Sequence, residues 1–142
     1  MDFSMEILFY KSVGNGRAEQ IHKIIGRSNL GCKLEVYQTI DSLSYRLSQP
    51  TDNLTVAILC ADRKKELSEI LLIKDLLNGT RVILVLPDRE EDTVAKGHSL
   101  RPRFLTYADS DFKEIVAVLS KMVGSVAMKS DEKTISRGDR PG

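Results

Sequence analysis

Five short runs of apolar and β-branched residues alternate with helical patterns along the chain, and this alternation constrains the fold more than any other feature. Parallel strands need a long crossover, usually a helix, between one strand and the next. Strict alternation therefore predicts a parallel sheet with helices on both faces. The run over 54–61 is nearly free of polar residues, which indicates a central strand buried on both faces. The expected strands cover residues 5–10, 33–39, 54–61, 81–86 and 104–107.

This pattern of strands and helices matches one common doubly wound architecture. We expect an α/β fold of three layers, with a five-stranded parallel sheet in the flavodoxin-like order 2-1-3-4-5. In such a sheet, ligands bind at the carboxyl ends of the strands, above strands one and three where the strand order reverses. The residues directly after the expected strands are therefore the first candidates for a functional site.

Apolar residues spaced three or four apart predict a helix after each strand, and capping residues predict where these helices begin. The expected helices cover 17–31, 42–50, 65–77, 89–97 and 112–123, with N-caps at Asp41 or Ser42, at Asp88 and at Asp111. From Ser125 the apolar spacing is lost, and charged residues mix with Ser, Gly and Pro. This composition predicts a disordered C-terminal tail over 125–142 that follows a single domain over 1–124.

Composition argues against several other classes of protein. The 142 residues include 21 basic and 20 acidic side chains, and a net charge of +1 gives no electrostatic basis for binding nucleic acid. No stretch reaches the roughly 18 apolar residues of a membrane span, and we expect a cytoplasmic protein without a membrane segment. The two cysteines lie 28 residues apart, and the two histidines fall in different elements, so we expect neither a disulfide framework nor a metal site.

Several segments resemble the receiver domain of bacterial two-component response regulators. Ile7-Leu8-Phe9-Tyr10, Val56-Ala57-Ile58-Leu59 and Val82-Ile83-Leu84-Val85 stand where receivers have their first, central and fourth strands. Arg103-Phe104-Leu105-Thr106-Tyr107-Ala108, followed by Asp111-Phe112, resembles the fifth strand and the start of the last helix. The resemblance covers residues 5–123 and implies a module in two-component signalling.

The positions that carry the chemistry of receivers hold other residue types in this chain. Receivers hold Mg²⁺ with an acidic pair after the first strand, because this hard cation prefers carboxylate oxygens. Set against the family, the acidic pair falls on Lys11 and Ser12, the phosphate-accepting aspartate on Cys60, the switch serine or threonine on Leu86, and the lysine on Tyr107. Phosphoryl transfer depends on positioning and charge neutralisation, so losing these groups together should abolish it.

We therefore interpret the chain as a pseudo-receiver that is not phosphorylated, has no cofactor and is not an enzyme. The resemblance implies that it acts through protein–protein interaction, with another signalling protein or with a second copy of itself as a homodimer. The expected docking surface comprises the fourth helix, the fifth strand and the last helix, with Arg101, Arg103, Tyr107 and Asp109 as candidate contacts.

Two alternatives remain open from the sequence. Asp62, two residues beyond Cys60, is the acceptor if the domain is an atypical receiver with a displaced site. Alternatively, the loop after the first strand resembles the phosphate loop of flavodoxins and binds FMN, a nucleotide or another small phosphate ligand at the helix N-terminus. Its candidate residues are Ser12, Gly14, Asn15, Gly16 and Arg17. Flavin binding also needs aromatic side chains in further loops, and the segment Cys60-Ala61-Asp62-Arg63-Lys64-Lys65 has none. The purely structural reading is that Gly14 and Gly16 allow a tight turn with positive φ before the helix.

Overall fold

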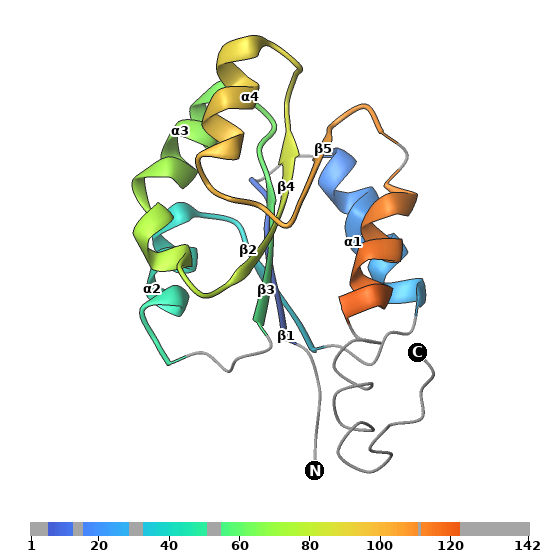
Figure 1. Ribbon diagram of the computed structural model, residues 1–142. Coiled ribbons are helices and arrows are strands. Elements are labelled where there is room, and N and C mark those ends of the chain that lie inside the picture. Colours follow the sequence, from blue (N-terminus) through green and yellow to red (C-terminus); the bar gives the residue numbers. More distant parts are fainter. Residues whose placement is uncertain (1–5, 13–15, 29–32, 51–54, 111, 123–142) are drawn as a thin grey trace, which may run out of the picture.

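The computed structural model describes residues 6–12, 16–28, 33–50, 55–110 and 112–122 (Figure 1). Every pair of neighbouring strands runs parallel, and the order across the sheet is β2-β1-β3-β4-β5. This result confirms the predicted α/β class, strand number and strand order. The strands are β1 (Glu6–Tyr10), β2 (Lys33–Tyr37), β3 (Thr55–Cys60), β4 (Arg81–Leu86) and β5 (Phe104–Tyr107).

Helices cover both faces of this sheet, as Figure 1 shows. One face carries α2 (Ile40–Leu47), α3 (Lys64–Leu72), the 3₁₀ turn η1 (Lys74–Leu77) and α4 (Glu91–His98). The other face carries α1 (Gly16–Ser28) and a last helix over residues 113–122. Within the described ranges, no helix is both long enough and apolar enough to cross a membrane.

The sheet divides the hydrophobic core into two clusters. Alternate residues of a strand point to opposite faces, so Ile7 and Phe9 pack with α1 and the last helix, whereas Leu8 and Tyr10 pack with α2 and α3. All six residues of β3 are buried, as the apolar run predicts. Because β3 is packed on both faces and paired on both edges, its carboxyl end is firmly held within the sheet.

Two predicted helix boundaries on the α2 and α3 side are wrong. The N-cap of α2 is Thr39, whose side-chain oxygen accepts a hydrogen bond from the Ser42 backbone N–H at 3.1 Å, and neither Asp41 nor Ser42 takes that position. The helix expected over 65–77 breaks at Ile73, and the chain continues as η1. The break keeps both Ile73 and Leu77 in the core, which apolar spacing alone does not distinguish from a continuous helix.

The boundaries of α4 also differ from the prediction. Glu90 is the N-cap, and the Asp88 carboxylate instead accepts a hydrogen bond from the Glu90 backbone N–H at 2.9 Å, ahead of the helix. The helix continues through Gly97 to His98. A Cβ atom at Gly97 would lie 3.0 Å from Leu86 Cδ1, so this glycine lets α4 pack closely on β4 rather than ending the helix. The expected cap Asp111 lies outside the described residues.

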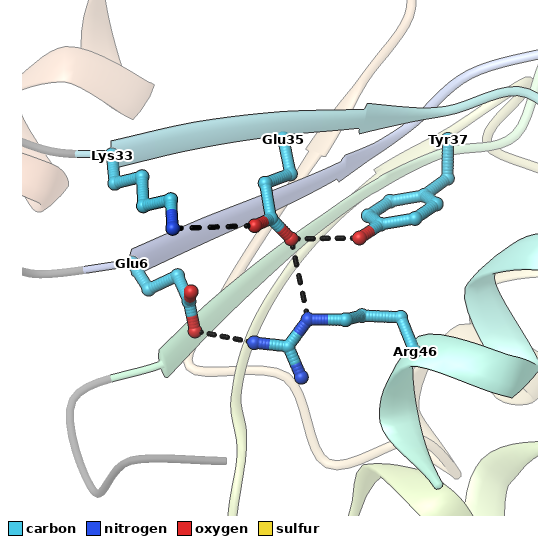
Figure 2. A network of polar contacts seen from close by, with 5 residues as sticks. All are labelled: Glu6, Lys33, Glu35, Tyr37 and Arg46. Carbon is cyan, nitrogen blue, oxygen red and sulfur yellow. Dashed lines mark hydrogen bonds and ion pairs between the residues drawn. The ribbon is translucent and has the colours of Figure 1, made fainter. Parts of the chain in front are cut away.

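The edge strand β2 is tied to the rest of the fold by a polar network around Arg46 (Figure 2). From α2, the Arg46 guanidinium reaches Glu6 on β1 at 2.7 Å and Glu35 on β2 at 3.2 Å. Tyr37 donates its hydroxyl hydrogen to the same Glu35 oxygen at 2.7 Å, and Lys33 lies 3.8 Å from the other oxygen. The Tyr37 hydrogen bond, followed by Arg46, lowers the pKa of Glu35. One helix side chain thus holds two strands in register.

Candidate functional site

The strands end together at one edge of the sheet, and most of the residues singled out from the sequence lie at this edge. The register pairs Tyr10 with Leu59, so Lys11, directly after β1, lies beside Cys60, the last residue of β3. Both side chains point to the α1 face: Lys11 pairs with Glu19 of α1, and Cys60 belongs to the cluster beneath that helix. The structure therefore brings together two of the residues that the sequence resemblance sets against the chemical positions of receivers.

Lys11 places a buried cation at this edge. Its backbone N–H donates to the Tyr37 carbonyl oxygen at 3.0 Å, and its ammonium forms an ion pair with Glu19 in the first turn of α1. The side chain of Lys11 is only 7% exposed, whereas that of Glu19 is 51% exposed. A buried ammonium is costly unless it is paired, so Glu19 fixes where this charge lies. A fixed positive charge repels a divalent cation at the same place.

Cys60 is a buried apolar side chain with a neutral thiol. Burial, with a further contribution from the Glu66 carboxylate, raises the pKa of the Cys60 thiol, while the Lys11 ammonium acts in the opposite direction. Thiol chemistry requires the thiolate. The Cys60 sulfur is thus protonated at neutral pH and belongs to the core under α1.

Asp62 lies beyond the end of β3 and is partly exposed. Its backbone N–H donates to Glu66 Oε1 at 2.5 Å, and its carboxylate lies 3.9 Å from the Arg63 Nε. The side chain borders a hollow of about 240 Å³ at the ends of β3, β4 and β5. The other residues around this hollow are Pro87, Asp88, Arg89, Tyr107, Ala108 and Asp109.

Arg89 closes one side of this hollow and was not a candidate from the sequence. Its guanidinium carbon lies 4.3 Å from the centre of the Tyr107 ring, and its Nη1 forms an ion pair of 2.5 Å with Asp109. A cation over an aromatic face is stabilised by the ring quadrupole. The contact joins the loop after β4 to the loop after β5. No sequence spacing predicts it, because the partners are 18 and 20 residues away from Arg89 along the chain.

The four candidate docking residues divide between the two ends of β5. Arg101 and Arg103 are exposed and precede the strand, whereas Tyr107 ends it and Asp109 follows. Arg101 adopts a left-handed backbone conformation with φ of 53°, and its N–H donates to the His98 carbonyl oxygen at 2.9 Å. The two arginines thus share one turn between α4 and β5, separate from the Arg89 contact.

The candidate phosphate loop is only partly described. Gly14, Asn15 and the side chain of Arg17 lie outside the described part of the chain. Ser12 is half-buried, and Gly16 is the first residue of α1. Gly16 is not among the glycines with positive φ, so the expectation of a positive-φ turn at this residue is wrong. In the described residues, no group of three His, Cys, Asp or Glu side chains is placed to hold a metal ion.

A second and larger hollow, of about 390 Å³, lies on the α2 and α3 side of the same edge. Tyr10, Glu66 and Glu69 line it and were not identified from the sequence. The only signal available was the position of Tyr10 as the last, inward-facing residue of an expected strand. The remaining lining residues are Ser12, Gln38, Thr39, Ile40, Asp41, Arg63 and Lys65.

Comparison with known proteins gives a structural match and no sequence match. No protein-family model and no curated protein matches the chain. Among solved structures, a response regulator protein from Burkholderia pseudomallei matches with a TM-score of 0.61 and 12% sequence identity, over 93% of this chain and 76% of that chain. That structure holds a phosphorylated aspartic acid, a calcium ion and citrate. At this level of identity the match concerns the fold, and it shows that the chain has a receiver-like α/β fold.

Proposed function

We propose that this chain is a receiver-like signalling module that works without aspartyl phosphorylation and acts by binding another protein or a second copy of itself. The observation that carries the proposal is the buried Lys11 ammonium beside Cys60 at the ends of β1 and β3. Receivers place carboxylates at these two positions, for a metal ion and for the phosphoryl group. Here one position holds a cation and the other a neutral thiol, so neither ligand has its electrostatic partner.

Without phosphorylation, the module needs another source of energy to change state. Moving a two-state population from 1:99 to 99:1 takes about 5.5 kcal/mol. A partner or a ligand that prefers one state supplies such a difference through binding. The Lys11–Glu19 ion pair joins β1 to α1, and the Arg89 contacts join the loops after β4 and β5, so both favour a single arrangement of this edge.

We place the module in the domain over 1–124 and in the cytoplasm.

Phosphorylation is tested directly by mass. After incubation of the purified full chain with Mg²⁺ and acetyl phosphate, we expect no gain of a phosphoryl mass and no change in melting temperature. Asp62→Asn is the matched control, because Asp62 is the half-exposed carboxylate that borders the 240 Å³ hollow. A stable gain of one phosphoryl group that disappears in Asp62→Asn would contradict the proposal and identify an atypical receiver with a displaced acceptor.

We place the docking surface on α4, β5 and the last helix, with Arg101, Arg103, Tyr107 and Asp109 as contacts. Replacing Arg101 and Arg103 together by alanine is expected to weaken binding of a partner captured on the immobilised protein about tenfold, because interface arginines carry a large share of binding energy. Both side chains are exposed, so the melting temperature should hardly change. The control replaces Lys23 and Arg27, which are exposed on α1. Binding unaltered by the Arg101 and Arg103 substitutions would refute this placement.

A further inference from the structure

The outer edge of β2 offers backbone groups to a further strand. β2 stands at one end of the sheet, and among the described residues no strand pairs with its outer edge. The Tyr37 carbonyl oxygen accepts the Lys11 N–H at 3.0 Å, so the backbone groups of Tyr37 face β1. Backbone groups alternate in direction along a strand, so those of Glu35 also face β1, whereas those of Leu34 and Val36 face outward. An outward-facing row of N–H and C=O groups is a template for pairing with another chain.

The side chains of β2 leave this edge accessible. The side chain of Lys33 is 69% exposed, and Val36 is 37% exposed. Lys33 and Glu35 project from the same face of the strand, the face on which Arg46 of α2 lies (Figure 2). The Lys33 Nζ and the Glu35 Oε2 are 3.8 Å apart, which is longer than a hydrogen bond. Lys33 therefore gives up no hydrogen bond to Glu35 when its ammonium turns to a carboxylate of another chain.

We propose that a second copy of this chain adds its β2 strand antiparallel to this edge, with the two-fold axis at Leu34. In a dimer of this symmetry the same surface patch meets itself. Residues at equal distances on either side of the axis then pair, so Lys33 of each copy lies opposite Glu35 of the other. Opposite charges directly across an antiparallel strand pair stabilise it.

The charges of β2 select this register over its neighbours. Outward-facing residues exchange the backbone hydrogen bonds, so the axis passes through Leu34, through Val36, or between them at Glu35. An axis at Glu35 places two carboxylates opposite each other, and like charges in that position are destabilising. An axis at Val36 places Glu35 opposite Tyr37 and forms no such ion pair. Charges on an edge strand generally discourage pairing, but the axis at Leu34 makes these charges complementary.

This edge is separate from the proposed docking surface on α4, β5 and the last helix. β2 and β5 are the opposite edges of the sheet. Pairing through β2 therefore leaves the proposed docking surface open for another protein. The inference goes beyond the proposed function, and the two surfaces can be tested independently.

Self-association of the full chain is measured by sedimentation equilibrium. We expect the average mass to rise toward twice that of one chain as the concentration increases. Lys33→Glu sets a carboxylate opposite Glu35 and should raise the Kd of the dimer about tenfold. The matched control is Arg103→Glu, which makes the same change of charge at an exposed position beside β5 and should leave the Kd unchanged.

A mixture of two variants tests the register itself. Chains that carry Lys33→Glu should pair with chains that carry Glu35→Lys, because each cross-strand pair again joins opposite charges. Each variant alone should associate more weakly than the mixture. Melting temperatures check the fold, since Glu35→Lys also removes a partner of Arg46.

Backbone variants keep the test valid if Glu35→Lys does not fold. Val36→Pro removes an outward-facing N–H, leaves the hydrogen bonds to β1 in place, and should raise the Kd of the dimer about tenfold. Val36→Thr keeps the N–H and should leave the Kd unchanged. Hydrogen exchange gives a second readout: the Leu34 N–H should exchange more slowly as the concentration rises, whereas the Glu35 N–H, which faces β1, should not change.

Several results would overturn the proposal. One is a chain that stays monomeric at about 1 mM, where even a small interface gives measurable association. A second is an effect of Arg103→Glu as large as that of Lys33→Glu, which would place the dimer at the other edge of the sheet. A third is association that Val36→Pro leaves unaltered. None of these results depends on the phosphorylation test.

Discussion

Replacing Glu19 by glutamine is expected to lower the free energy of unfolding by about 3 kcal/mol, which is the usual cost of leaving a buried charge without its partner. The Lys11 side chain is 7% exposed, so its ammonium cannot regain much hydration while the protein remains folded. Urea unfolding followed by circular dichroism measures the change. Glu114→Gln, which removes an equivalent but exposed charge, should alter the free energy of unfolding by less than about 0.5 kcal/mol.

The reciprocal substitution should behave differently. Lys11→Met is expected to leave the free energy of unfolding within about 1 kcal/mol of the parent value, because an unbranched apolar side chain replaces a buried charge of similar length. The carboxylate of the half-exposed Glu19 is then hydrated by solvent. Adding Lys11→Met to Glu19→Gln should accordingly restore most of the lost stability. Equal losses from the two single substitutions would contradict this account of a buried cation held by an exposed anion.

Replacing Arg46 by methionine is expected to lower the free energy of unfolding by about 2 kcal/mol, since it leaves two carboxylates close together without a cation between them. The side chains of Glu6 and Glu35 are 18% and 27% exposed, so water compensates them only in part. Arg46→Lys should recover about half of the loss, because a single ammonium cannot present two separate N–H groups to the two carboxylates as a guanidinium does. Arg27→Met, on an exposed position of α1, is the matched control.

The loss in the Arg46 variant should depend on pH. The Tyr37 hydrogen bond and then Arg46 lower the pKa of folded Glu35 below its usual value of 4.5. A carboxyl group whose pKa is lower in the folded state stabilises the fold at pH values above its unfolded pKa. This stabilisation is lost as the pH falls through the folded pKa. The difference in free energy of unfolding between the parent protein and Arg46→Met is therefore expected to be largest at pH 7 and smaller at pH 3. A difference that stays constant between these pH values would show that packing, and not charge, is the cause.

Much of the fold could be predicted from local sequence patterns. The apolar run that became β3 is buried over its whole length, and strict alternation of strands and helices gave the parallel sheet and its order. The errors fell where tertiary packing competes with local signals. Thr39 rather than Asp41 caps α2, and Gly97 lies inside α4 because the helix must approach Leu86 closely. A glycine required for packing looks the same in a sequence as one that ends a helix.

The candidate site was predictable only in part. The resemblance to receivers drew attention to Lys11, Cys60 and Tyr107, because they end or follow expected strands. Sequence spacing could not show that Lys11 is buried and paired with Glu19, because the packing of α1 against the end of β1 decides which helix side chain Lys11 meets. Arg89 was missed for a similar reason, since its partners come from a different loop.

The sequence by itself determined the class of fold, the strand order and the residue types at the carboxyl ends of the strands, because periodicity and strand-end chemistry are local properties of a chain. The tertiary structure alone decided which charges meet there. It paired Lys11 with Glu19, placed Arg46 between Glu6 and Glu35 on two strands, and brought Arg89 to Tyr107 and Asp109. Electrostatic energies depend on distance and burial, and both are fixed only when separate elements pack together.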